Sequence, residues 1–241
     1  MHKKEIEGLK ILCKYSSIPN SLGYCGKENS YVLFNSFLKK PTKEKGKKIK
    51  KIIKTFVGLS PYLRIISDSN GLTEFDEEVA QAYWLGNKLL DNIDKEELKK
   101  MILEDFTKPG MLPYYIAEQK ANNLKSKVFP NHSFHVLYIN FVTKKVKPIL
   151  SNLNNCLIKP AIYKDKNFFI TTKLSLVKDK LDLKKTIKKF ETQKKCFSEK
   201  IFSTHWNTLV DEITKEEQKN LEKYTNKNLN LANSCLQSSK S

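Results

Sequence analysis

The stretch CLIKPAIYKDKNFFITTKLSLV, residues 156–177, decides the fold that the sequence predicts. Its apolar and β-branched residues come in short runs, which lie at 156–158, 161–163, 168–171 and 174–177. Polar residues separate the runs, with a Lys-Asp-Lys-Asn turn in the middle, as is typical of short strands joined by tight connections. A further run at 200–205 completes the pattern. This segment therefore predicts a small β-barrel-like domain.

The sequence before this segment has a helical pattern instead. Apolar residues recur at helical spacing from residue 5 to about residue 124. The clearest example places Val79, Ala80, Tyr83 and Trp84 on one broad apolar face. We therefore expect residues 1–128 to form an α-helical domain.

Two further segments complete the predicted organisation. Residues 129–150 read as a connecting junction, in which HVLYINFV at 135–142 favours a strand or a buried turn of helix. Thr214 followed by Glu217 is a capping-box pattern, which predicts the start of a C-terminal helix. We expect residues 151–235 to hold the barrel and this helix, and residues 236–241 to be a frayed tail. The predicted fold class is α+β.

Composition limits the classes of function. The net charge is +18 at pH 7, but Arg64 is the only arginine. Specific recognition of bases and phosphates favours the planar fork of arginine, so a lysine-rich nucleic-acid binder is the less favoured alternative. The sequence contains no apolar run long enough for a membrane span and no signal-peptide core, which predicts a cytoplasmic protein without a membrane partner. Its five cysteines include no C-x-x-C pair, which argues against a zinc-finger pattern.

Cys156, Leu157 and Pro160 open the β-rich segment, and His205 stands at its end before a charged helix. This order resembles the HypC/HupF-type hydrogenase maturation chaperones, over about residues 155–232. The resemblance implies that the Cys156 thiolate, a soft donor suited to iron, holds an iron centre and that His205 supports it. It also implies a protein partner, either a hydrogenase large-subunit precursor or another maturation protein. The expected mechanism is binding and handover, not enzymatic turnover.

Three motifs spread along the chain carry a second resemblance. They are LGYCG at 22–26, AYWLGN at 82–87 and HSFHV at 132–136. On these motifs the chain is identified as a member of an uncharacterised prokaryotic family, often encoded beside nickel–iron hydrogenase genes. Membership of that family implies no particular reaction.

An enzymatic alternative rests on Cys25, which lies in a tight Gly-Tyr-Cys-Gly loop before a helix. A helix N-terminus favours the thiolate, and His132 or His135 could serve as the base of a cysteine hydrolase or transferase. The two histidines could bind a metal together only if His132 precedes the strand, because an odd offset on a strand points two rings to opposite faces. A structural role as small buried residues stays open for Cys25 and Cys156.

Overall fold

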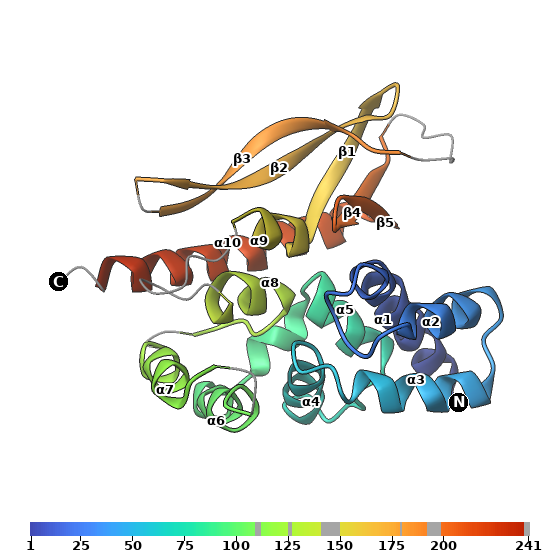
Figure 1. Ribbon diagram of the computed structural model, residues 1–241, viewed down its shortest axis with the longest axis horizontal. Coiled ribbons are helices and arrows are strands. Elements are labelled where there is room, and N and C mark those ends of the chain that lie inside the picture. The colour runs from blue at the N-terminus through green and yellow to red at the C-terminus, as the bar shows by residue number, and fades with distance from the viewer. Residues whose placement is uncertain (109–111, 125–126, 141–149, 179, 192–198, 239–241) are drawn as a thin grey trace. The chain divides into compact units, whose positions relative to one another are not determined.

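The computed structural model describes residues 1–108, 112–124, 127–140, 150–178, 180–191 and 199–238. The chain divides into two compact units, Met1–Asn131 and His132–Ser241 (Figure 1). The first is helical, and the second combines helices with one antiparallel sheet, which confirms the α+β class. The boundary falls three residues beyond the expected end of the helical domain at residue 128.

The first unit is built from short helices joined by turns. They are α1 (Lys3–Ser21), α2 (Ser30–Lys39), α3 (Lys43–Ile53), α4 (Ser60–Asp68), α5 (Glu77–Trp84), η1 (Lys88–Asn92), α6 (Lys95–Asp105) and α7 (Tyr114–Asn122). The predicted apolar face of α5 is buried, and Trp84 stacks on Tyr15 of α1 with ring centroids 5.1 Å apart. Helix α6 starts at Asp94, whose carboxylate accepts hydrogen bonds from the backbone N–H groups of Glu96 and Glu97.

The second unit begins with two short helical elements. They include the start of segment 135–142, for which the sequence favoured either a strand or a buried turn of helix. The helical elements of this unit are α8 (His132–Phe134), the π-helical turn η2 (His135–Ile139), α9 (Leu150–Cys156) and α10 (Lys215–Ser238). Four consecutive residues from Val136 to Ile139 are buried, so the segment is apolar all round, and such a run fits a buried helix as well as a buried strand. The strand at 135–142 is therefore wrong over the residues seen; residues 141–149 of the junction and 239–241 of the tail lie outside the described ranges.

The sheet has five antiparallel strands in the order β3-β2-β1-β4-β5. They are β1 (Lys159–Asp165), β2 (Phe168–Val177), β3 (Lys180–Lys189), β4 (Ile201–His205) and β5 (Thr208–Ile213). Within the described part of the chain β3 and β5 are the two edges, so the strands of the expected β-barrel-like domain form an open sheet. The β1–β2 turn occurs where predicted, with Lys166 and Asn167 at positive φ. A second two-residue turn, Trp206-Asn207, also at positive φ, joins β4 to β5.

Helices α9 and α10 pack along the sheet of this unit (Figure 1). Leu174 and Leu181 from the sheet share a core with Leu153, Leu157 and Leu229 from the helical segments. A separate cluster joins three strand residues, Ala161, Phe169 and Phe202, with Phe190, which directly follows β3. The first cluster packs α9 against β2 and β3, and the second packs β1, β2 and β4 together.

The predicted capping box starts α10. Thr214 Oγ1 accepts from the Glu217 N–H at 3.1 Å, and a Glu217 carboxylate oxygen accepts from the Thr214 N–H at 2.7 Å. Among the residues described, no helix is both long and apolar enough to cross a lipid bilayer.

Candidate metal centre

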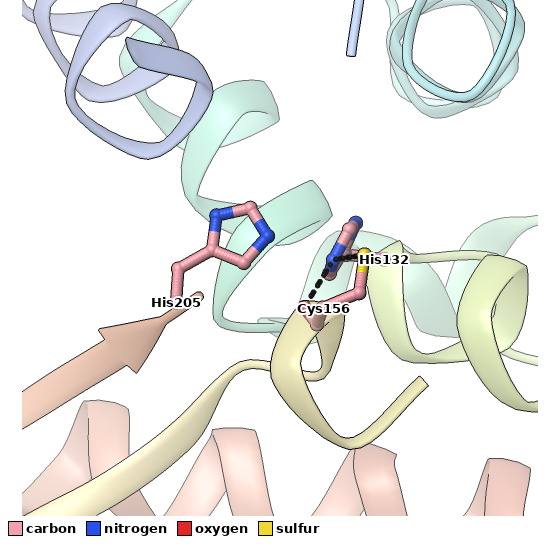
Figure 2. A group of neighbouring side chains, drawn as sticks. All are labelled: His132, Cys156 and His205. Carbon is pink, nitrogen blue, oxygen red and sulfur yellow. Dashed lines mark hydrogen bonds between the residues drawn. The ribbon is translucent and has the colours of Figure 1, made fainter. Parts of the chain in front are cut away.

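His132, Cys156 and His205 meet within the second unit, although up to 73 positions separate them in the chain. His132 begins α8, Cys156 ends α9 and His205 ends β4. Figure 2 shows the three side chains facing one another. Their ligand atoms, a nitrogen from each ring and the Cys156 sulfur, all lie within 4.8 Å of one another.

Cys156 does not begin a strand, as the sequence suggested, but is the last residue of α9. Leu153 of α9 and Leu157, the residue that follows the helix, both belong to the core of the unit. Leu157 N–H donates to the Leu153 carbonyl at 2.9 Å and so closes the last turn. The Cys156 side chain is half-buried, at the edge of the core rather than inside it.

His132 contacts Cys156 twice. Its Nε2 lies 2.9 Å from the Cys156 backbone oxygen and 3.6 Å from the Cys156 Sγ (Figure 2). Because a carbonyl oxygen can only accept, the shorter contact places the ring proton on Nε2 in the metal-free protein. A metal ion bound through Nε2 would replace this proton and this hydrogen bond.

His205 completes the group from the sheet side and is only 1% exposed. Its ring stands edge-on to that of His132, with centroids 5.2 Å apart and planes at 80°. The residue after it is tied to α9, since Trp206 N–H donates to the Asn155 carbonyl at 2.7 Å. This hydrogen bond joins the end of β4 to the residue before Cys156, and it holds His205 and Cys156 in register.

The separations can be compared with those of a tetrahedral metal site. Zinc bonds to sulfur and nitrogen imply edges of about 3.6 Å between sulfur and nitrogen and about 3.4 Å between two nitrogens. The 3.6 Å distance from Cys156 Sγ to His132 Nε2 equals the first edge. The widest separation allowed by the 4.8 Å limit exceeds these two edges by about 1.2 Å and about 1.4 Å, which a side-chain adjustment can supply. One edge of the site is thus preformed, and the other two exceed those of a tetrahedral site by at most about 1.4 Å.

Burial keeps His132 in the form that binds metals. Desolvation lowers the pKa of His132 from 6.5 to about 4, although the hydrogen bond to the Cys156 carbonyl opposes part of the shift. The ring is therefore neutral at pH 7, as metal ligation requires. Its helix is anchored by a buried hydrogen bond in which Asn228 Nδ2 of α10 donates to Ser133 Oγ at 2.9 Å.

His135 does not join this group, although it was a candidate with His132. It lies one residue beyond α8, in η2, and its side chain is half-buried. The pKa of His135 is lowered, mainly by desolvation and secondly by the nearby His132. Among the described residues, the group that could hold a metal ion joins His132 to Cys156 and His205 and does not include His135.

Cys25 belongs to the first unit, while His132 and His135 belong to the second. Its backbone oxygen accepts from Asn20 Nδ2 at 2.6 Å, and this bond shapes the loop before α2. Burial raises the pKa of the Cys25 thiol from 9.0 to about 11, which is the opposite of the activation that a nucleophile needs. The catalytic pairing of Cys25 with either histidine stays a prediction.

No curated protein and no solved structure matches this chain. A family model does match, and it covers residues 4–239, which include the three ligand candidates. The chain therefore belongs to a family of unknown function, DUF6390.

Proposed function

We propose that the second unit binds one transition-metal ion through His132, Cys156 and His205, and that the protein is an accessory protein of metallocentre assembly. The observation that carries the proposal is the convergence of two imidazoles and one thiol, from three separate elements, within 4.8 Å. Cysteine and neutral histidine together are a donor set for late first-row metals and not for magnesium or calcium.

The number of ligands supports a role in transfer. Four-coordinate structural zinc sites use four protein ligands, whereas sites that exchange a ligand keep one position open. Among the residues that the structure describes, three such donors meet, which leaves a fourth position for water or for a ligand of another protein. The half-buried Cys156 provides an approach to the ion, while His132 and His205 hold it from the buried side.

A narrower proposal names iron as the metal and hydrogenase maturation as the pathway. Its support is the Cys-Leu-x-x-Pro opening at residues 156–160, together with the histidine at the end of β4. The contact of His132 with Cys156 adds a ligand that this sequence pattern does not contain. The partner would be a hydrogenase large-subunit precursor or another maturation protein.

The metal site is tested by anaerobic titration of the full chain with Co²⁺, followed by absorption spectroscopy. We expect one equivalent to bind, with a thiolate-to-cobalt charge-transfer band. Cys156→Ser should abolish that band and weaken binding at least about tenfold, because loss of even an outer partner of a metal ligand commonly costs that much. Cys235→Ser, which removes a half-buried thiol on α10, is the matched control and should keep the band.

Two results would reject the site: wild-type protein that binds no stoichiometric cobalt, or a charge-transfer band that survives in Cys156→Ser. The narrower proposal has its own test. After anaerobic co-expression with hydrogenase maturation proteins, infrared bands of iron-bound cyanide and carbonyl should appear in the purified wild type and vanish in Cys156→Ala. Cobalt binding without these bands would keep the metal site and discard the hydrogenase role.

A further inference from the structure

A second feature of this unit lies where β1 begins and the β4–β5 turn comes back toward α9. It is a cavity of about 230 Å³, lined by residues of α9 and of the first four strands. Its polar lining includes three lysines together with hydroxyl and amide groups: Lys159, Lys173, Lys188, Thr171, Thr186 and Asn207. Among the described residues that line it there is no aspartate or glutamate.

Lys159 is the most deeply placed of the three lysines and is only 8% exposed. Its Nζ donates to the Asn154 backbone oxygen at 2.7 Å and to the Asn154 Oδ1 at 3.0 Å. These two bonds satisfy two of the three N–H groups of an ammonium, but both acceptors are neutral. Burying an ammonium without a counter-charge costs free energy. Desolvation, followed by repulsion from Lys188, accordingly lowers the pKa of Lys159 to about 7.

Lys188 is held at the same cavity by a chain of amides. Its Nζ donates to Asn207 Oδ1, and Asn207 Nδ2 donates to Asn155 Oδ1 at 2.9 Å. Asn207 can hold this position because it adopts the left-handed backbone conformation of the β4–β5 turn. Consecutive asparagines at the end of α9, Asn154 and Asn155, thus position both lysines, one directly and the other through Asn207.

The rest of the lining gives the cavity two further properties. The hydroxyl of Thr171 donates to the Pro160 carbonyl, and that of Thr204 donates to the Lys159 carbonyl, so neither is available as a donor. Thr186 makes no hydrogen bond within the described ranges through its hydroxyl, which is available to donate to an acceptor. Phe190 supplies an apolar wall. The cavity therefore combines positive charge and a donor with an apolar side.

We propose that this cavity binds a small organic anion, with its phosphate or carboxylate group placed between the ammonium groups of Lys159 and Lys188 and its apolar part against Phe190. An oxyanion would supply the counter-charge that the lining lacks and relieve the repulsion between the two lysines. The volume suits a metabolite smaller than most drug-sized ligands, whose pockets start at about 300 Å³.

The cavity is separate from the metal centre. Thr204 lines the cavity and the next residue, His205, is a metal-ligand candidate. Successive residues of a strand point to opposite faces of a sheet, so β4 presents one residue to each site. A failure of the proposed metal site would therefore not argue against the anion site, and the reverse also holds.

The test is calorimetric titration of the full chain at constant ionic strength with four probes: inorganic phosphate, phenyl phosphate, acetate and benzoate. We expect saturable binding with one site per chain, and tighter binding of the aromatic member of the preferred pair. Preference for the two phosphates or for the two carboxylates identifies the anionic group. Lys159→Met and Lys188→Gln should each weaken binding at least about tenfold, in line with the loss of a charge-assisted hydrogen bond.

Lys164→Gln is the matched control, because it removes the same charge from an exposed residue near the end of β1. It should bind the probes as the wild type does. The proposal is overturned if no probe saturates, or if Lys164→Gln weakens binding as much as Lys188→Gln does. Since Lys188 is only partly buried near the edge of the sheet, Lys188→Gln keeps the test valid if Lys159→Met fails to fold.

Discussion

His132 is neutral in the folded protein at a pH where an unfolded chain would already bind a proton. Its folded pKa is about 4 and its ordinary value is 6.5. Between these values the unfolded state binds more protons, so the stability present above pH 6.5 is lost as the pH falls toward 4. The loss amounts to about 3 kcal/mol at most from this residue.

Urea unfolding of metal-free protein between pH 4 and 7.5, followed by circular dichroism, measures this loss. We expect His132→Gln to make the decline in unfolding free energy shallower but not to abolish it, because burial lowers the pKa of His135 as well. His2→Gln, at an exposed position, should leave the decline unchanged. An unchanged decline in His132→Gln would mean that His132 is not the neutral buried ring described above.

Cys25 yields a second prediction at the residue scale. With its pKa raised to about 11 from 9.0, its thiolate fraction at neutral pH falls on the order of 100-fold below that of an unperturbed thiol. Iodoacetamide at pH 7.5 should therefore label Cys25 much more slowly in the native protein than in urea, as measured by peptide mass spectrometry. Equal labelling rates in the native protein and in urea would instead support the interpretation of Cys25 as a nucleophile.

The sequence alone identified some residues of the candidate metal centre and not others. Cys156 and His205 stood out because they open and close the β-rich segment. His132 was noticed as a base for Cys25 or as a joint metal ligand with His135, and its grouping with Cys156 and His205 was not foreseen. Its contact with Cys156 spans 24 positions and depends on how α8 and α9 pack together, which no local pattern contains. The lysine cavity was missed for the same reason, since its lining comes from α9 and separate strands.

At the scale of elements, the capping box of α10 can be tested directly. Thr214→Ala removes the oxygen that accepts from the Glu217 N–H, and an N-cap loss of this kind costs about 1 kcal/mol. Urea unfolding should show this decrease, while Ser234→Ala, an exposed substitution in the same helix, should change stability by less than about 0.5 kcal/mol. Equal effects of the two substitutions would show that the cap contributes nothing specific.

Elements with an apolar face, a cap signal or a run of strand-favouring residues could be predicted, and elements without such a local signal could not. Helix α5 and the start of α10 followed from an apolar face and a capping box. Strand β3 was missed because its sequence, KLDLKKTIKK, contains five lysines and few of the residues that favour strands. It forms because ten residues of β2 pair with it in an unbroken register. Pairing of this kind is a tertiary effect that overrides local preference.

At the scale of the whole molecule, both proposed sites use residues of the second unit alone. The core that fixes α9 is also built within this unit, from Val136 to Ala232. We therefore expect a fragment of residues 132–241 to fold and to bind one equivalent of Co²⁺ with the charge-transfer band of the full chain. Circular dichroism and cobalt titration of the fragment measure the two properties separately, and Cys156→Ser in the same fragment is the control.

The two measurements separate the possible explanations of a failure. A folded fragment that binds no cobalt, when the full chain does bind it, would show that the first unit supplies a ligand or orders the three already identified. A fragment that binds cobalt as the full chain does would assign the chemistry to residues 132–241. The helical unit would then be left for a different task, which under the proposed accessory role is docking of the partner that receives the metal.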